Sequence, residues 1–497
     1  MPTLIKNGLV YDGIHSEPER KDILVKGNTI VGIGSFSKTS IFRQVDASGA
    51  YILPGFIDTS SDIDHYFGFS SHELQRRLIE CGITSVVAGN FGLSLAPTCK
   101  DFFEYLYRPY GDSSFTCNWL SFREFFQEIK KQKLLLNVGT LFGSSNLLHP
   151  FLGNEARDLS DSELVACRNL LSVGLKEGAF GLSSEDDASF LFTPLFEEIA
   201  EILSSRGRVL SVHVAVRDSS KDVFSKIKRL LQIARKTSVS LQISQVRPSL
   251  LSSSEWEGLR EMLDTAGSSI EALFDFSLSE FVSLPLYRFL PASFQKTSFD
   301  TMLEMIRSPR AKRELLLHLR SFKERDIYLG YVPSHLLPFL GKSLSELSSI
   351  FQVSFEEAFL KLMNESRLKA VCLCRDARER DILSLLALSS SSLLSFGGAL
   401  TLQDSLPASD RFSIQKLRAL SDSSGISFGS IISRLTSLPA RKFGMAGRGT
   451  IKEGSFADLL VVRDDVISRV FVNGRPILQD GVFSSHFSGN GLYPMMR

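Results

Sequence analysis

The middle of the chain alternates short apolar runs with stretches of helical periodicity, and no other feature restricts the fold as much. Amphipathic stretches such as SHELQRRLIECG and SKDVFSKIKRLLQIARK separate most of the apolar runs. This repeated order of strand and helix is typical of a parallel sheet, and eight such runs favour a closed (β/α)8 barrel over an open doubly wound sheet. The runs that we expect to form strands are 52–58, 83–89, 134–141, 179–183, 209–216, 239–244, 270–276 and 393–398.

Both ends of the chain have the pattern of short antiparallel strands. Alternating runs such as DILVKGNTIVGIG near the start and SRVFVNGRPI near the end are broken by NG, DG and GN turns. We therefore predict a small β-domain formed by residues 1–50 and 441–497, beside an α/β barrel at 51–440. The segment at about 277–392 is long and rich in helical patterns, which predicts an insertion, either a subdomain or a lid over the barrel mouth.

Composition argues against several functional classes. The net charge of +1 argues against a nucleic-acid partner or binding to an anionic membrane. No apolar run reaches the roughly 18 residues of a membrane span, no signal peptide is visible, and no GxGxxG or Walker-A loop follows an expected strand. The six cysteines form no CxxC pair, and Cys372 and Cys374 alternate in VCLC as in a buried strand rather than a metal site. We expect a soluble cytoplasmic protein with reduced thiols.

Several segments resemble the N-acyl-D-amino-acid deacylases (D-aminoacylases) of the amidohydrolase superfamily over nearly the whole chain. They are the opening up to VDASGAYILPGFID, GITSVVAGNFGLSLAP at 82–97, EGAFGLSS at 177–184, VSLQIS at 239–244 and TSLPARKFGMAGRGTIKEGSFADLLVV at 436–462. The resemblance implies an amidohydrolase barrel with a β-domain. It also implies hydrolysis of an amide by metal-activated water, with ligands at the carboxyl ends of the strands and a carboxylate base after the eighth.

At the first two strands, the residues at the implied metal positions differ from those of the family. The two histidines that follow the family's first strand fall at Ser60 and Asp62, and the bridging cysteine of its GNCG loop falls at Phe91. Serine is a poor zinc ligand, phenylalanine binds no divalent metal, and only Asp62 offers a suitable oxygen. By strand alternation, Ser60 and Asp62 share the inward face with Asp58.

The remaining positions are changed as well, with one exception. His213 keeps the family's histidine after the fifth strand, whereas Gln245 replaces the histidine after the sixth. The general base of the family's SDG stretch falls at Phe396 or Gly397 in SFGG, depending on register. In the third-strand loop, Ser144 replaces another histidine.

The number of ligands favours one hypothesis over the others. A catalytic zinc typically has about three protein ligands and an open position, and Asp62 and His213 are the two best surviving candidates. We therefore predict a catalytically inactive homologue, a pseudoenzyme that needs no cofactor and binds a small-molecule ligand or a protein partner. No residue is assigned a catalytic role, and a homo-oligomer is compatible with the sequence.

Two alternatives remain open. A working hydrolase would act on the carbon–nitrogen bond of an N-acyl amino acid or a related amide, with zinc in a rebuilt site around Asp62, Asp64, His65 and His213. A structural subunit would instead assemble with an active paralogue. Outside a rebuilt site, Asp64 and His65 are expected to be solvated loop residues or helix caps. Arg217, in AVRDS, would either hold a substrate carboxylate or form a surface ion pair.

Overall fold

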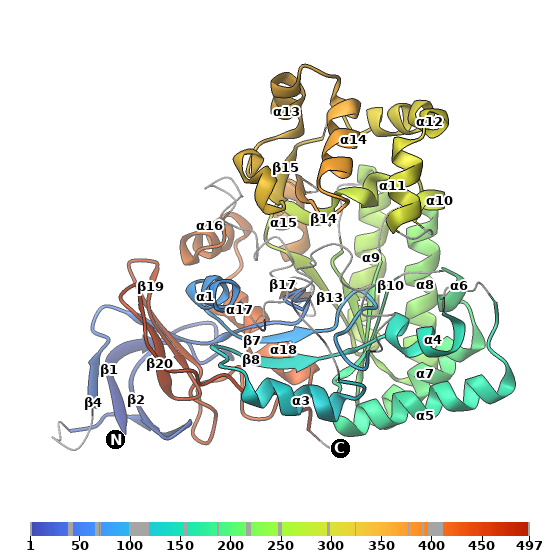
Figure 1. Ribbon diagram of the computed structural model, residues 1–497. Coiled ribbons are helices and arrows are strands. Elements are labelled where there is room, and N and C mark those ends of the chain that lie inside the picture. Colours follow the sequence, from blue (N-terminus) through green and yellow to red (C-terminus); the bar gives the residue numbers. More distant parts are fainter. Residues whose placement is uncertain are drawn as a thin grey trace.

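The computed structural model contains a barrel, a sheet domain formed by both ends of the chain, and a subdomain inserted before the last barrel strand (Figure 1). In the part of the chain that the structure describes, no helix is both long and apolar enough to cross a membrane. The structure describes all residues except 1, 38–42, 65–68, 70, 99–118, 154–156, 186–187, 215–219, 247–250, 296–298, 324, 376, 389–391, 396–410 and 496–497.

Parallel strands form the barrel, as predicted. They are hydrogen-bonded in two arcs, β6-β7-β8 and β9-β10-β11-β12-β13-β17, and only Leu141 separates β8 from β9 along the chain. The strands are short because each spans only the height of the barrel wall. Their bounds are β6 (Phe56–Asp58), β7 (Ile83–Ala88), β8 (Asn137–Thr140), β9 (Phe142–Gly143), β10 (Gly181–Glu185), β11 (Val209–His213), β12 (Ser240–Ser244), β13 (Ala272–Ser277) and β17 (Ser392–Ser395).

Amphipathic helices cover the outside of the barrel. In α1 (His72–Glu80), the Ser71 side chain caps the first turn by accepting a hydrogen bond from the backbone of Leu74, and Leu78 and Ile79 are buried against the strands. The other helices of this layer are α3 (Phe122–Lys131), α4 (Ser144–Leu152), α5 (Asp161–Glu177), α6 (Ala188–Leu191), α7 (Pro194–Ser205), α8 (Ser220–Thr237), α9 (Ser253–Ser269), α15 (Glu379–Leu386), α16 (Ile414–Ser424) and α17 (Phe428–Leu435).

The amino-terminal end of the barrel is closed by the short helix α18 (Ser437–Lys442). Phe443, at the end of α18, packs against Phe180 inside the barrel with ring centroids 6.1 Å apart. The buried Lys442 donates hydrogen bonds from Nζ to two backbone carbonyls at the start of β12 and β13, each at 2.8 Å. This end of the barrel is therefore a packed apolar layer, and a ligand site in the barrel has to lie at the opposite end.

Both termini contribute to one nine-stranded sheet. Its order is β21-β20-β19-β18-β5-β1-β2-β3, and β4 pairs with β1. The antiparallel pairing of β5 with β18 joins the two ends of the chain, as the sequence predicted. The bounds are β1 (Thr3–Val10), β2 (Glu19–Lys26), β3 (Thr29–Gly34), β4 (Arg43–Asp46), β5 (Tyr51–Pro54), β18 (Leu459–Arg463), β19 (Val466–Val472), β20 (Arg475–Gln479) and β21 (Val482–Phe483).

The inserted segment forms a subdomain with its own hydrophobic core and an antiparallel sheet of order β14-β16-β15, a sheet that the helical pattern had not predicted. In β16, Cys372 and Cys374 face the helices of the subdomain, whereas Val371 and Leu373 pack toward Leu74 of α1. The VCLC stretch is thus a buried strand, as predicted. The elements are β14 (Phe281–Pro285), η2 (Leu286–Phe289), α10 (Ala292–Gln295), α11 (Phe299–Arg307), α12 (Pro309–Arg320), β15 (Ile327–Tyr331), η3 (Ser334–Phe339), α13 (Leu344–Phe351), α14 (Phe355–Glu365) and β16 (Val371–Arg375).

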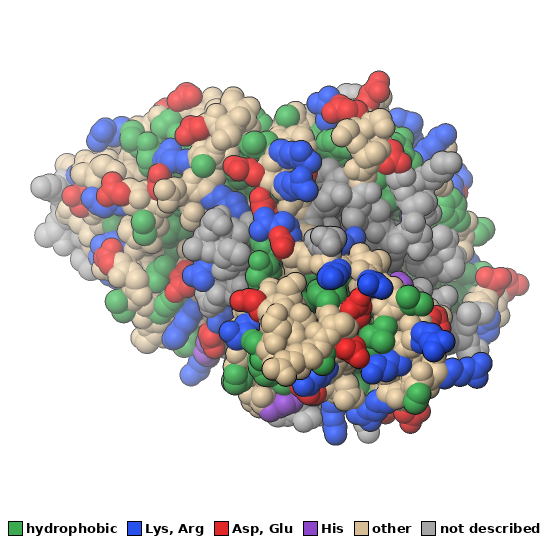
Figure 2. All heavy atoms as spheres, turned by 90° about the horizontal axis from the view of Figure 1, so that it is seen from above, with side chains coloured by type: hydrophobic (Ala, Val, Ile, Leu, Met, Phe, Trp, Pro, Cys, Tyr) green, Lys and Arg blue, Asp and Glu red, His purple; other side chains and the backbone are tan. Residues whose placement is uncertain are grey.

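The face of the molecule on the side of the inserted subdomain has mixed charge. Figure 2 shows Lys and Arg side chains interspersed with Asp and Glu over its coloured surface. This distribution agrees with the net charge of +1 for the whole chain. The described part of this face therefore presents no extended field of a single sign, which is what a nucleic acid would require.

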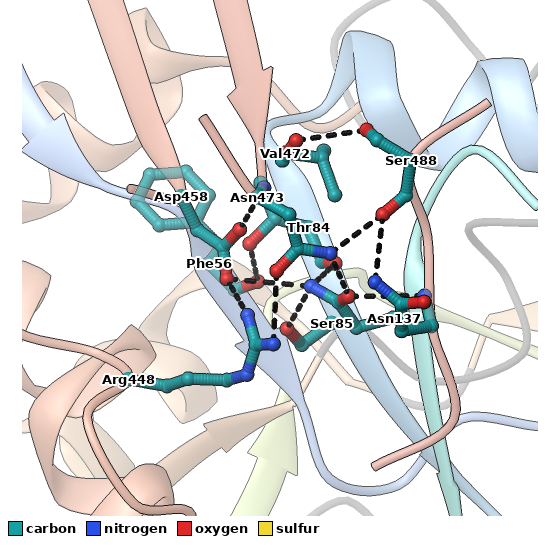
Figure 3. A network of polar contacts seen from close by, with 10 residues as sticks. Phe56, Thr84, Ser85, Asn137, Arg448, Asp458, Val472, Asn473 and Ser488 are labelled. Atoms are coloured by element: carbon teal, nitrogen blue, oxygen red, sulfur yellow. Dashed lines mark hydrogen bonds and ion pairs between the residues drawn. The ribbon is translucent and has the colours of Figure 1, made fainter. Parts of the chain in front are cut away.

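A buried polar network joins the barrel to the β-domain (Figure 3). Arg448 forms an ion pair with Asp458 and donates a hydrogen bond from Nη2 to Asn473 Oδ1 at 2.9 Å. Asn473 in turn donates from Nδ2 to Asn137 Oδ1 at 2.7 Å and to the Ser488 carbonyl at 2.6 Å. The network thereby connects the barrel strand β8, the β-domain and the carboxyl-terminal segment.

Breaking the buried ion pair tests how strongly this junction stabilises the fold. Both partners are only 6% exposed, so Arg448→Met leaves the Asp458 carboxylate buried without its cation. We expect a loss of about 3–5 kcal/mol in the free energy of unfolding, measured by chemical denaturation. Arg463→Met, which removes an exposed arginine from β18, is the matched control and should change stability by less than about 0.5 kcal/mol. Equal effects of the two substitutions would contradict the assignment.

Candidate functional site

The carboxyl ends of β6 and β12 meet across the barrel mouth through their serines. Ser60, two residues after β6, is fully buried, and its Oγ lies 2.8 Å from Ser244 Oγ at the end of β12. The backbone N–H of Ser60 donates to Asp58 Oδ1 at 3.0 Å, which fixes the turn that follows the strand. Ser60 therefore points into the barrel, as strand alternation predicted.

The centre of this arrangement is Asp275, a buried carboxyl on β13 with no exposed surface. Its Oδ2 accepts hydrogen bonds from Ser60 Oγ at 2.8 Å and from Gln242 Nε2 at 2.5 Å. Its Oδ1 accepts from the backbone N–H of Gln245 at 2.9 Å and from Ser244 Oγ at 3.3 Å. Burial raises the pKa of the Asp275 carboxyl to about 6, because the cost of desolvation exceeds the opposing effect of these four hydrogen bonds.

Phe91 and His213 lie together on another side of the mouth. Their ring centroids are 5.0 Å apart and their planes are perpendicular, so the two rings meet edge to face. Phe91 has a left-handed backbone with φ of 57°, a conformation that bulky residues rarely adopt. The loop is held by its neighbours, since Asn90 donates from Nδ2 to the carbonyls of Ser61 and Val87 at 3.0 and 2.8 Å. The aromatic ring thus lies beside the histidine at which the family resemblance implies a metal ligand.

The acidic residues after β6 are buried. Asp62 is 6% exposed and Asp64 is 3% exposed. Asp64 Oδ2 accepts a hydrogen bond from the backbone N–H of Gly89 at 2.9 Å, which connects the first loop to the end of β7. The expectation that Asp64 is a solvated loop residue or a helix cap is therefore wrong. The reason is that Asp64 folds in against the end of the neighbouring strand, where it supplies the acceptor for the buried Gly89 N–H group.

The inserted subdomain reaches the same end of the barrel. Arg288, in η2, forms an ion pair with Glu185 at the end of β10, with Nη2 and Oε1 separated by 2.5 Å. Glu185 pairs in register with His213 of the neighbouring strand. Gln295 donates to the Arg288 carbonyl at 3.0 Å and so helps to hold η2 in position. The mouth is therefore bordered by an ion pair between barrel and subdomain.

The donor chemistry at these positions does not fit the zinc ion that the family resemblance implies. Within the described part of the chain, no three His, Cys, Asp or Glu side chains cluster closely enough to hold a metal. The Ser60 hydroxyl is engaged with Asp275, and Phe91 offers no lone pair. Gln245 has an amide in place of an imidazole, which is not among the usual zinc ligands, and its backbone N–H donates to Asp275.

Four of the residues named from the sequence lie outside the described residues. These are His65, Arg217, Phe396 and Gly397. Ser144 is described, and it is a buried residue at the start of α4. The structure therefore brings Ser60 and Gln245 together around one carboxyl, and Phe91 and His213 together as a ring pair.

Comparison with known proteins agrees with this architecture. A D-aminoacylase from Alcaligenes xylosoxydans xylosoxydans is 26% identical over 525 aligned positions, which cover 98% of this chain and 97% of that protein. The chain is homologous to the D-aminoacylases. An N-acyl-D-aspartate deacylase from the same organism is 27% identical over 234 residues, which cover 47% of this chain and 46% of the relative. No family model matches the sequence of this D-aminoacylase homologue.

Solved structures show the same fold for this D-aminoacylase homologue. The N-acyl-D-glutamate deacylase from Bordetella bronchiseptica, solved with zinc and a phosphonate inhibitor, superposes with a TM-score of 0.76 at 21% identity and 99% coverage of both chains. A D-aminoacylase structure, described as defining a subset of amidohydrolases, gives a TM-score of 0.74 at 21% identity and 99% coverage of both chains. The homologue therefore keeps the complete architecture of these enzymes.

Asp275 is the residue at the mouth that the sequence analysis missed. The run IEALFDF was correctly predicted to be a strand, but the carboxylate near its end, Asp275, received no attention. A charged residue inside an otherwise apolar run is rarely buried unless it has partners. That exception to the pattern was the available signal, and it would have pointed to a polar group facing the barrel interior.

The pKa of Asp275 makes a testable contribution to stability. Its folded value of about 6 exceeds its ordinary value of 3.8, so between these values the folded protein binds more protons than the unfolded chain. The stabilising contribution is therefore complete below about pH 4 and is lost as the pH rises through about 6. Relative to Asp275→Asn, the wild type should lose about 3 kcal/mol between about pH 4 and pH 7. Chemical denaturation of both proteins across this pH range tests the prediction. If the difference in the free energy of unfolding between wild type and Asp275→Asn did not change with pH, the raised pKa of Asp275 would be contradicted.

Proposed function

We propose that this D-aminoacylase homologue does not hydrolyse amides and that its barrel mouth binds a small-molecule ligand or a protein partner. The observation that supports this most directly is the use of Ser60, at the family's first ligand position, as a hydrogen-bond donor to Asp275. Metal-dependent amide hydrolysis needs lone pairs directed at the ion and a base to move the proton. Along the described mouth, donors and an aromatic ring stand at most of these positions.

The ligand, in this proposal, enters beside Phe91 and His213, both of which are partly exposed at the mouth. Phe91 offers an apolar edge, and the nearby ion pair of Arg288 with Glu185 offers both signs of charge. A small molecule with an apolar part and a polar or charged part matches this lining. The four described cysteines are buried and free, which is compatible with a cytoplasmic location.

Homology to deacylases favours a second candidate, a working hydrolase of N-acyl amino acids. Its site would have to be rebuilt around Asp62 and His213, with further ligands from residues outside the described part of the chain. Asp64 is a less suitable ligand than the sequence suggested, because its Oδ2 already accepts from Gly89 N–H. A structural subunit of an active paralogue is the third candidate, and it would co-purify with that paralogue.

Metal content and hydrolysis of the purified full chain separate these functions. After exposure to zinc and removal of loosely held ions, we expect no more than about a tenth of a zinc ion per chain, because no three potential ligands converge among the residues that the structure describes. Hydrolysis of N-acetyl-D-amino acids should be undetectable with and without zinc. The matched variant His213→Ala should give the same low zinc content. Nearly one zinc per chain, lost in His213→Ala and accompanied by hydrolysis, would establish the working hydrolase instead.

A further inference from the structure

The polar groups that the structure records on the two oxygens of Asp275 all act as hydrogen-bond donors toward it. Two serine hydroxyls, one side-chain amide and one backbone N–H converge on its two oxygens from β12 and from the segment after β6. A group of donors of this kind stabilises an anion, whereas a metal ion needs acceptors with available lone pairs. The chemistry of this part of the mouth is therefore the reverse of that of a zinc site.

Two of these donors come from positions at which the family resemblance places metal ligands. Ser60 stands at the first position after β6, and Gln245 stands at the position after β12. Ser60 uses its hydroxyl, and Gln245 uses its backbone N–H, toward the same carboxyl. The replacement at Ser60 therefore adds a side-chain donor to this carboxyl, and the backbone N–H at position 245, which any residue except proline would supply, completes the set.

Gln242 shows that the arrangement is directed at the carboxylate. Its Nε2 lies 2.5 Å from Asp275 Oδ2, while its own buried Oε1 has no hydrogen-bond donor within the described residues. The opposite orientation of the amide would place its Oε1 against the carboxylate and bring two acceptors together. The side chain therefore leaves one of its own atoms unsatisfied in order to donate to the carboxylate.

We propose that the family's cation site has become a carboxylate-binding site in this chain, and that the side chain of Asp275 is its resident carboxylate. The proposal rests on the part of the proposed function that excludes zinc at this position. It goes further in naming what replaces the metal: an internal anion that ties the segment after β6 to β12 and β13. A free carboxylate of similar size should enter the same group of donors when Asp275 is removed.

Chemical rescue tests this proposal. In Asp275→Ala, the N–H of Gln245 loses its acceptor and Gln242 Nε2 keeps only a long contact of 3.4 Å to Ser60 Oγ, whereas Ser60 and Ser244 can still bond to each other. We expect the melting temperature to fall by several degrees. Added formate should then raise the melting temperature of the variant more than that of the wild type, and more than sodium chloride at the same ionic strength. Zinc should raise neither.

The matched control is Phe276→Ala, the next residue of the same strand, whose ring packs in the surrounding core. It leaves an apolar cavity without donors, so formate should stabilise it no more than the wild type. Formate acting equally on both variants, or Asp275→Ala melting like the wild type, would overturn the proposal. If formate rescue fails but the wild type binds no zinc and hydrolyses no amide, only the carboxylate site is overturned and the proposed function still stands.

A second variant decides the question if Asp275→Ala does not fold. Ser60→His restores the family's first ligand in the full chain, but it removes a donor and places an imidazole against the Asp275 carboxyl. We expect a lower melting temperature and no zinc-dependent increase. One zinc per chain in Ser60→His with a raised melting temperature would overturn the carboxylate site. One zinc per chain with hydrolysis in the wild type would also overturn the proposed function.

Discussion

The chain passes from the β-domain into the barrel at Gly55. The rest of the structure depends on the close packing of the two units at this residue. β5 ends at Pro54 and β6 begins at Phe56. The Gly55 N–H donates to the Asp458 carbonyl at 2.9 Å, and a Cβ at this position would lie 2.2 Å from Thr84 Oγ1. No side chain larger than hydrogen fits between the two units. The height of β6 in the barrel, and with it the depth of Ser60, is therefore set by the β-domain.

The two ends of the barrel have different roles: the end next to the β-domain stabilises the fold, and the mouth is free to change. The Arg448 network and α18 lie at the amino-terminal end of the barrel, and Asp275 lies toward the mouth. In parallel barrels the amino-terminal end of the strands contributes stability, and the carboxyl-terminal end carries the chemistry. Substitutions at the mouth can therefore alter the site while the packing at the other end preserves the fold, which agrees with TM-scores of 0.76 and 0.74 at only 21% identity.

Most of the fold could be predicted because its signals are local. Strand and helix periods, turn residues and the apolar runs are visible within windows of a few residues, and they gave the barrel and the sheet joined from both termini. The sheet of the inserted subdomain was missed because β14, β15 and β16 pair across intervals filled with helices. The contact of Ser60 with Asp275 was missed for the same reason. Alternation predicts which face a side chain occupies, but not its partner 215 positions away.

The backbone at the mouth explains how the side chains could change without loss of the frame. Phe91 and Gln245 both have left-handed φ values, 57° and 53°, although neither is glycine or asparagine. Such a conformation costs about 1–3 kcal/mol and persists only where neighbouring contacts over-determine it. At Gln245 that contact is the bond from its own N–H to Asp275, and beside Phe91 it is the bond from Gly92 N–H to Ser183 Oγ at 3.2 Å. Because these bonds use backbone N–H groups, they leave the side chains at 91 and 245 free to differ. The loop geometry is thus maintained by backbone N–H groups, and side chains at these positions can change without loss of that geometry.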